Sequence, residues 1–288
     1  MKPFRVLAPN LPDRDGHGLC ALAVMTKAPQ AGRVKTRLVP PLTPEEAAEL
    51  NKCFLHDTAV AISSACSRRP ACPPKPRRRR VGDKDKTPEF HASHPPSRSF
   101  GVAGSEAAIA ACGIAVYTPL GAESVYTEIL PADFRLLLQR GDKFGERLYF
   151  AVEDLFKCGF ESVCLIDSDS PTVPAENFAA AVELLSTSDD RVVLGPSDDG
   201  GYYLIGVKKP HRQLFEQIDW STDRVLNQTI RRTNEIGLEV KLLPNGYDVD
   251  DDASLRRLWD ELLGKTAGEG VAPNTRKFLV SIAAQNKL

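Results

Sequence analysis

Short apolar runs and amphipathic segments alternate along most of the chain. The runs Cys20–Thr26, Val163–Ile166 and Arg191–Ser197 are bounded by polar or turn-forming residues, a pattern typical of buried strands. The segment Lys143–Cys158 repeats apolar residues at helical spacing and is followed by a glycine, which predicts an amphipathic helix. This alternation predicts an α/β fold, a three-layer α/β/α sandwich around a mostly parallel sheet.

One interruption of the alternation predicts a strand of opposite direction. Asp198–Gly201 stands between the runs Arg191–Ser197 and Tyr202–Val207. An Asp-Gly step between two such runs is a strong signal for a tight turn, and strands joined by a tight turn run antiparallel. We therefore expect a mixed sheet with at least one antiparallel member.

The same patterns predict the domain boundaries. Residues 1–18 hold three prolines and two glycines without a period, so we expect an N-terminal extension outside the fold. Residues 19–264 carry the alternating pattern of one domain, and residues 265–288 form a weakly patterned C-terminal tail. Within the domain, residues 67–99 are rich in proline and basic residues, which predicts a disordered insert.

The insert changes the meaning of the net charge. It holds ten Lys or Arg and three Asp or Glu residues, which gives a local charge of +7. Because the net charge of the whole chain is −1, the residues outside the insert carry a charge of −8. An acidic main body argues against general nucleic-acid binding. For the insert itself a solvated loop is the favoured interpretation, and a role at a nucleic acid or a membrane surface is the alternative.

The overall composition is ordinary for a soluble protein, with 42% hydrophobic and 26% charged residues. The sequence has neither an apolar stretch of the ~20 residues that span a bilayer nor a signal-peptide core at its start. We therefore expect a cytoplasmic protein without a membrane span. Seven scattered cysteines without a C-x-x-C pair predict reduced thiols in the core.

Candidate chemistry begins directly after the first long strand. The segment Lys27–Leu38 contains Gly32 and four cations, among them Lys35 and Arg37. In α/β nucleotide-binding proteins the loop at this position meets phosphates with backbone N–H groups and basic side chains. The spacing matches neither a Walker A nor a dinucleotide motif, and a solvated surface loop is the alternative.

Acidic residues follow a second strand. The run Val163–Ile166 ends at Asp167 and Asp169, a D-x-D that places hard oxygen ligands where open α/β sheets bind their ligands. A polar turn is the alternative, because aspartate is common in turns. Two interpretations are also open for Asp198 and Asp199: they act as a base or a ligand on the acceptor side of the site, or they only shape the turn.

Four separated segments together resemble one bacterial family. They are Lys27–Leu38, Leu165–Pro171, Leu194–Gly206 and Asp219–Leu226, with Asp248–Asp250 as a weaker fifth. In these segments the chain resembles the nucleotide-diphospho-sugar transferase-like proteins, a glycosyltransferase-like family of unknown function in the GT-A-type superfamily. That superfamily also holds molybdenum cofactor guanylyltransferases and 2-phospholactate guanylyltransferases.

The resemblance implies a GT-A-like fold, a nucleotide above the first strands, and Mg²⁺ or Mn²⁺ held by aspartates. Asp169 matches the acid of the family's Gly-Ser-Asp-Cys-Pro-type motif, in which Asp167 here replaces the glycine and Ser170 the cysteine. Asp250 matches the position of a second metal ligand. The predicted site therefore comprises catalytic residues (Lys35, Asp169 and Asp199), nucleotide-binding residues (Lys27, Gly32, Lys35, Arg37 and Gly200) and metal ligands (Asp167, Asp169, Asp248 and Asp250).

Two reactions fit this prediction. The first is glycosyl transfer from a nucleotide-diphospho-sugar to a small-molecule acceptor, and the alternative is nucleotidyl transfer with release of pyrophosphate. In both reactions charge develops on phosphate oxygens, so basic side chains and a divalent ion supply most of the catalysis. A non-catalytic binding protein is the third hypothesis. The sequence specifies neither the base, the sugar nor the acceptor.

Overall fold

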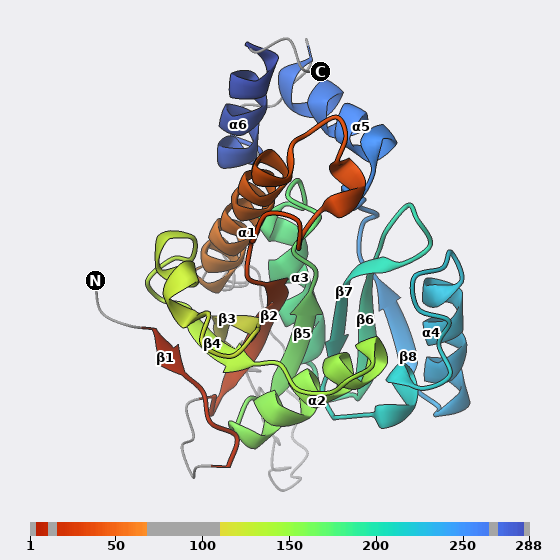
Figure 1. Ribbon diagram of the computed structural model, residues 1–288. Coiled ribbons are helices and arrows are strands. Elements are labelled where there is room, and N and C mark those ends of the chain that lie inside the picture. The colour runs from red at the N-terminus through yellow and green to blue at the C-terminus, as the bar shows by residue number, and fades with distance from the viewer. Residues whose placement is uncertain (1–3, 11–15, 68–109, 265–269, 285–288) are drawn as a thin grey trace, which may run out of the picture.

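The computed structural model describes residues 4–10, 16–67, 110–264 and 270–284. Within these ranges an eight-stranded sheet has the order β1-β4-β3-β2-β5-β7-β6-β8 (Figure 1). The strands are β1 (Arg5–Val6), β2 (Leu19–Lys27), β3 (Ala110–Thr118), β4 (Arg135–Leu138), β5 (Ser162–Ile166), β6 (Arg191–Pro196), β7 (Tyr202–Val207) and β8 (Glu239–Leu242). The α-helices are α1 (Pro44–Ser67), α2 (Phe144–Lys157), α3 (Ala175–Ser186), α4 (Val225–Glu235), α5 (Asp252–Leu263) and α6 (Pro273–Ala283), and short 3-10 helices are η1 (Thr36–Leu38), η2 (Glu123–Glu128) and η3 (Arg212–Phe215).

The sheet is mixed and mostly parallel, as predicted. Strand β7 runs antiparallel to both of its neighbours, β5 and β6, and the other neighbouring pairs are parallel. The turn Asp198–Gly201 joins β6 to β7, which confirms the predicted hairpin.

The direction of the chain across the sheet reverses between β2 and β5. From β2 the chain passes to β3 and β4 on one side, and then returns to place β5 on the other side of β2. In open α/β sheets such a reversal leaves a crevice at the carboxyl ends of the two strands, and ligands bind there. Lys27 and Ile166, the last residues of β2 and β5, therefore lie at the edge where a site is expected.

Helices cover both faces of the sheet, which confirms the three-layer prediction. On one face α1 and α3 bury apolar side chains against the strands, including Leu55 and Phe178. On the other face α2, η3 and α4 do the same, with Leu155 and Leu214 fully buried. Each of the two faces thus has its own apolar core.

A third core lies among α1, α5 and α6, which Figure 1 shows together at the top of the molecule. Leu50, Leu258 and Leu279 are fully buried there. The carboxylate of Asp57 on α1 accepts the backbone N–H groups of Asn274 and Thr275 at the start of α6. The prediction that residues 265–288 form a C-terminal tail is therefore wrong for residues 270–284, which the structure describes, because α6 packs as part of the fold.

The expected N-terminal extension, 1–18, is also wrong in part. Arg5–Val6 form β1 beside β4, and Leu7 is buried. Too few apolar residues stand in this stretch for a periodic pattern, so the sequence carried no strand signal. The predicted insert, 67–99, lies outside the described residues apart from Ser67, which ends α1.

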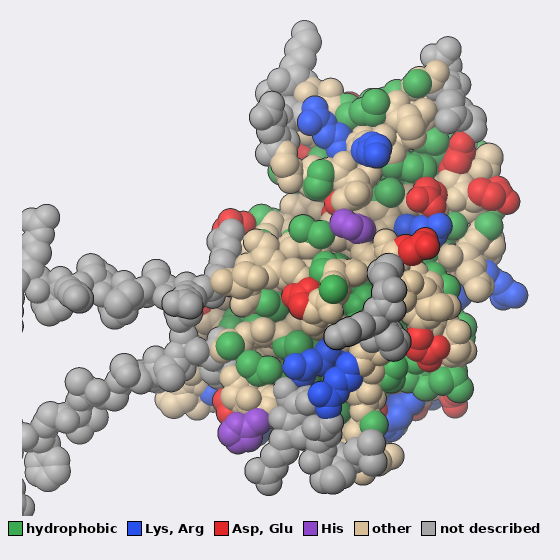
Figure 2. Space-filling view, turned by 90° about the vertical axis from the view of Figure 1, so that its left-hand side faces the viewer, with side chains coloured by type: hydrophobic (Ala, Val, Ile, Leu, Met, Phe, Trp, Pro, Cys, Tyr) green, Lys and Arg blue, Asp and Glu red, His purple; other side chains and the backbone are tan. Residues whose placement is uncertain are grey.

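Other expectations concern the thiols and the surface. Six of the cysteines fall in described residues and form no disulfide, as expected, with Cys20, Cys158 and Cys164 buried. No described helix combines the length and the apolar character needed to cross a membrane. On the face in Figure 2, basic side chains occur in small groups among acidic and apolar ones.

Candidate functional site

A cavity of about 730 Å³ opens where β2 and β5 end. The charged residues predicted for the site all line it: Lys27, Lys35, Arg37, Asp167, Asp169, Asp199, Asp248 and Asp250. Gly32 and Gly200, the two predicted glycines, do not line it. The structure therefore brings these charged residues together from four distant segments, and Arg33 and Asp223, which were not predicted as site residues, line the cavity as well.

The basic loop, Lys27–Leu38, forms one wall of the cavity. The ammonium of Lys27 donates a hydrogen bond to the carbonyl oxygen of Arg33 at 3.2 Å, which folds the loop back onto the end of β2. Gly32 takes a φ of 70° within this bend, a backbone conformation that favours glycine. Lys27, Arg33 and Arg37 consequently line the same wall as a group of cations.

Lys35, the remaining cation of the loop, is paired with two carboxylates. Its Nζ lies 2.9 Å from Oδ1 of Asp169, 2.7 Å from Oδ1 of Asp250 and 2.7 Å from the carbonyl oxygen of Val249. Its side chain is only 4% exposed. Burial lowers the pKa of Lys35, but the charges and hydrogen bonds of the two aspartates outweigh it and raise the pKa overall. The ammonium is thus held by carboxylates, although the sequence predicted a phosphate contact.

Asp169 and Asp250 are brought together by the backbone as well. The N–H of Val249 donates to the carbonyl oxygen of Asp169 at 2.9 Å, which fastens the segment before α5 to the segment after β5. The side chains of Asp169 and Asp250 remain partly exposed, at 32% and 47%. The predicted convergence of these two acids is therefore present, with Lys35 between them.

Asp167, the other acid of the D-x-D, is positioned differently. Its carboxylate accepts hydrogen bonds from the hydroxyl of Ser170 at 2.8 Å and from the N–H of Asp169 at 3.4 Å. Burial first, and then the charge of Asp169, raise its pKa well above the usual range. Both carboxylate oxygens of Asp167 therefore already accept a hydrogen bond, which leaves them less available to a metal.

Asp248 resembles Asp167 in this respect. The hydroxyl of Ser197 donates to its Oδ1 at 3.1 Å. Burial, followed by the charges of Asp199 and Asp250, raises its pKa. Of the four predicted metal ligands, Asp169 and Asp250 are therefore the pair best suited to hold a cation.

The fit of a divalent ion depends on this pair. Among the described residues, no group of three or more His, Cys, Asp or Glu side chains is arranged to hold a metal. Mg²⁺, however, is commonly held by one or two carboxylates and completes its shell with waters and phosphate oxygens. Asp169 and Asp250 already hold one cation, so they fit such an ion if it replaces the ammonium of Lys35.

The two aspartates of the turn between β6 and β7 differ in their position relative to the cavity. Asp198 accepts hydrogen bonds from Arg257 and Asn245 and does not line the cavity. Asp199 lines the cavity, and its Oδ1 accepts the N–H of Gly201 at 2.8 Å. Of the two acids, only Asp199 is therefore placed to meet a bound molecule.

Gly200 has a packing role in the same turn. Its φ is 85°, and a Cβ atom added there would lie 2.2 Å from the carbonyl oxygen of Asp223. This close approach requires glycine and holds the turn against the loop before α4. The structure thus gives no support to the prediction that Gly200 contacts the nucleotide.

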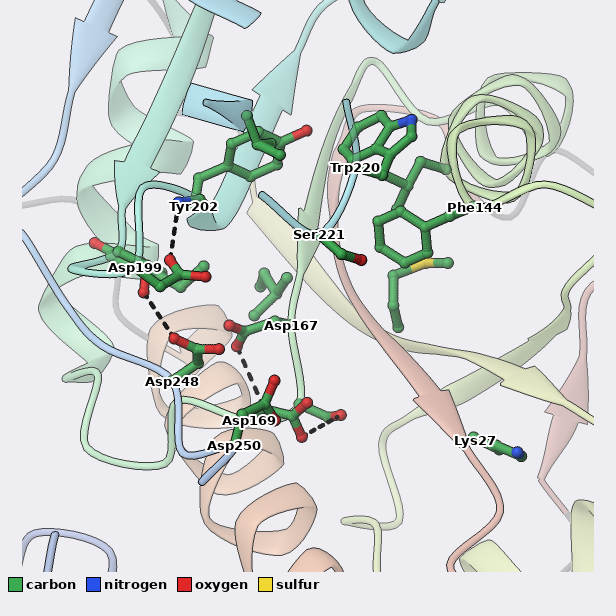
Figure 3. A pocket seen from close by; sticks show the side chains of 18 of the residues that line it. Lys27, Phe144, Asp167, Asp169, Asp199, Tyr202, Trp220, Ser221, Asp248 and Asp250 are labelled. Atoms are coloured by element: carbon green, nitrogen blue, oxygen red, sulfur yellow. Dashed lines mark hydrogen bonds between the residues drawn. The ribbon is translucent and has the colours of Figure 1, made fainter. Parts of the chain in front are cut away.

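An aromatic part of the cavity was not predicted. Phe144, the first residue of α2, and Trp220, from the loop before α4, contact each other with ring centroids 5.1 Å apart in an edge-to-face arrangement. Figure 3 shows them on a different side of the cavity from the carboxylates. The sequence signal for Trp220 was its place in Asp219–Leu226, a segment of the family resemblance, whereas Phe144 was assigned to the apolar face of a helix.

Solved structures with the same fold include a protein from Desulfovibrio desulfuricans G20. It is described as a "putative nucleotide-diphospho-sugar transferase" and is 24% identical over 93% of this chain and 96% of its own, with a TM-score of 0.69. This similarity confirms the predicted fold.

More distant structures are also similar. A CMP:2-keto-3-deoxy-manno-octonic acid synthetase in complex with CTP is 10% identical over 83% of this chain and 96% of its own, with a TM-score of 0.45. A cytidylyltransferase from Leptospira borgpetersenii is 8% identical over 93% and 96%, with a TM-score of 0.44.

No curated protein matches the chain. A family model does match part of it, and this part includes β3 to β7 and the D-x-D. Over residues 107–222 the chain matches the bacterial family described as "Uncharacterized protein conserved in bacteria (DUF2064)", and the family resemblance inferred from its motifs is confirmed.

Proposed function

We propose that this protein is a metal-dependent transferase that uses a nucleotide-activated donor, and that the donor is a nucleotide-diphospho-sugar. The proposal depends chiefly on one observation, the cavity at the reversal between β2 and β5 that has a basic loop on one side and the Asp169–Asp250 pair on another. The description of the Desulfovibrio protein as a nucleotide-diphospho-sugar transferase supports it.

The basic loop would bind the diphosphate of the donor. Lys27, Arg33 and Arg37 line one wall and carry three positive charges toward the same space. Hydrogen bonds between charged groups of this kind contribute roughly 1.5–3 kcal/mol each. Lys35 would join them once its carboxylate partners take up another cation.

Asp169 and Asp250 would hold Mg²⁺ or Mn²⁺ in place of the Lys35 ammonium. The bound ion would offset the negative charge that develops on the phosphate oxygens as the donor bond breaks. Asp167 and Asp248, each bonded to a serine, would position the loops around the pair.

Asp199 would act as the base for the acceptor. The acceptor oxygen forms a bond to the anomeric carbon of the sugar, and the bond from that carbon to the diphosphate breaks. The nucleoside diphosphate leaves with the electron pair, and the hydroxyl proton of the acceptor passes to the carboxylate of Asp199. No covalent intermediate with the protein is needed.

A screen of nucleotides tests this function. Nucleotide-diphospho-sugars with Mg²⁺ or Mn²⁺ should raise the melting temperature, since a ligand that binds the native state stabilises it. Turnover should then release a nucleoside diphosphate. Release of pyrophosphate from a nucleoside triphosphate and a phosphorylated acceptor would instead establish the alternative, a nucleotidyltransferase.

A further inference from the structure

The walls of the cavity differ in charge. Every Lys or Arg among the described residues that line it belongs to the basic loop: Lys27, Arg33, Lys35 and Arg37. The aromatic part of the lining, formed by Phe144, Trp220 and Asp223, contributes two aromatic rings and one carboxylate. A phosphate group would therefore be attracted to the basic loop and repelled from the aromatic part.

The aromatic part is held in place by its neighbours. Phe144 is 48% exposed although it opens an amphipathic helix, so its ring faces space and does not complete a core. A Cβ atom added to Gly145 would lie 2.6 Å from the indole nitrogen of Trp220, so Trp220 packs tightly on the start of α2. The two rings thus form a fixed surface, the Phe144–Trp220 shelf.

The backbone beside the shelf is in a costly conformation. Ser221 has a φ of 63°, in the left-handed region that a non-glycine residue seldom adopts, and it lines the cavity (Figure 3). Strained residues of this kind persist only where the surroundings hold them, and they gather at binding sites. The hydroxyl of Ser221 adds an uncharged hydrogen-bonding group next to Trp220.

Two basic side chains near the shelf, Arg147 and Arg224, do not add a positive charge to the lining of the cavity. The guanidinium of Arg147 lies 5.8 Å from the centre of the Phe144 ring but does not line the cavity. Arg224, next in sequence to Asp223, is paired with Asp219 at 3.2 Å. The shelf is therefore suited to an uncharged molecule with an apolar face.

From these observations we infer the class of the acceptor: an uncharged, hydroxyl-bearing ring compound whose apolar face lies on the Phe144–Trp220 shelf. Its hydroxyl group points toward Asp199, which takes the proton. This inference rests on the proposed function and deepens it, because it excludes phosphorylated acceptors. Aromatic rings suit such a ligand, since ring faces of low polarity gain from contact with them while hydroxyl groups bond at the edge.

Trp220 provides a direct readout of binding. The chain contains two tryptophans, so in the variant Trp259→Phe the emission comes from Trp220 alone. Phenyl glucoside, an uncharged ring compound, should change this emission in a saturable manner without any donor present. Its 6-phosphate, which differs only by the phosphate group, should bind at least tenfold more weakly.

Two further variants in the same background make the result specific. Phe144→Ala should weaken the response to phenyl glucoside at least tenfold, whereas Leu242→Ala, at an exposed apolar position on β8, should leave it unchanged. Equal or tighter binding of the 6-phosphate, or no response of Trp220 to either compound, would overturn the inference.

The experiment also separates this inference from the proposed function. Binding of nucleotide sugars depends on the basic loop and is measured by melting temperature in the absence of phenyl glucoside. Failure of every nucleotide sugar to bind would overturn the proposed function even if Trp220 responds to phenyl glucoside. If nucleotide sugars bind but Trp220 emission does not respond to phenyl glucoside, the proposed function is retained and only the inferred class of acceptor is excluded.

Discussion

The ammonium of Lys35 lies 2.9 Å from the carboxylate of Asp169, and these two residues follow two different strands, β2 and β5. Both had been predicted as site residues, one for a phosphate and the other for a metal. The ion pair means that the two predicted functions compete for the same contact. If Asp169 and Asp250 take up a metal ion as proposed, Lys35 must first be released from them.

The first prediction concerns the stability contributed by Lys35. Replacing Lys35 with methionine keeps the length of the side chain but leaves two carboxylates without their shared cation. We expect a loss of about 1–3 kcal/mol in the free energy of unfolding, because both carboxylates are partly exposed and water recovers part of the cost. Urea unfolding of Lys35→Met measures it.

Arg37→Met is the matched control for this variant. Arg37 lines the same cavity and carries the same charge, but it is Lys35 that pairs with Asp169 and Asp250. Its loss should change the free energy of unfolding by less than about 0.5 kcal/mol. Equal unfolding midpoints for Lys35→Met and the wild type would show that the ion pair contributes nothing.

The second prediction concerns Mg²⁺ in the absence of nucleotide. In Lys35→Met the carboxylates of Asp169 and Asp250 no longer hold an ammonium, so Mg²⁺ should raise the melting temperature more than it does in the wild type. The double variant Lys35→Met with Asp169→Asn should lose this gain. A gain that persists in the double variant would mean that Mg²⁺ binds elsewhere.

The third prediction separates the two acids of the D-x-D. Asp169→Asn should abolish metal-dependent nucleotide binding in calorimetric titrations, and it should also destabilise the protein because Lys35 loses a partner. Asp167→Asn should be much milder, because both carboxylate oxygens of Asp167 are already engaged by hydrogen bonds within the protein. Equal metal dependence of nucleotide binding in Asp169→Asn and the wild type would remove Asp169 from the site.

The fourth prediction uses the two aspartates of the hairpin turn. Asp199→Asn should lower kcat about 10²–10⁴-fold with little change in donor affinity, which is the usual contribution of a general base. Asp198→Asn should have a small effect, because Asp198 pairs with Arg257 outside the cavity. Steady-state kinetics with a donor from the screen decides this, and equal losses in both variants would contradict the assignment.

The fifth prediction concerns pH. The ammonium of Lys157 lies 2.7 Å from Glu153 and, with Arg140 and despite partial burial, lowers the pKa of Glu153. A lowered carboxylate pKa gives stability that is present above about pH 4.3 and is lost as the pH falls through the folded-state pKa. Glu153→Gln should therefore cost roughly 0.2–1 kcal/mol at pH 7.

This difference should shrink as the pH falls below about 4, since the wild-type carboxylate is then protonated as well. Glu161→Gln, at an exposed position just before β5, serves as the control. Thermal unfolding of the three proteins at several pH values measures the effect. A constant difference between Glu153→Gln and the wild type across the whole range would contradict it.

The layers of the fold could be predicted because they depend on local patterns, whereas several charged residues of the cavity were named only through the family resemblance, and Asp223 was not named at all. Alternating apolar runs predict strands, and turn residues predict where loops end the strands. The pairing of Lys35 with Asp250 could not be predicted from the sequence, because 215 positions separate the two residues and only the folded sheet brings them together. The same holds for Phe144 and Trp220, whose contact depends on how α2 packs.

The short strand β1 and helix α6 were missed for another reason. Arg5–Val6 is too short to show a period, and its place in the sheet comes from pairing with Arg135 and Leu136. Helix α6 follows a stretch of weak pattern, and its start is held by Asp57 on a distant helix. Elements that depend on a partner for their stability carry little signal of their own.

The third core, among α1, α5 and α6, links the two halves of the charged site. Leu38 ends the basic loop, Val249 stands between Asp248 and Asp250, and both are fully buried in this one core. The basic loop and the carboxylate segment are therefore anchored before any ligand arrives. A donor then spends little of its interaction energy on ordering the chain, so its affinity should reflect contacts and charge more than the entropy of loop closure.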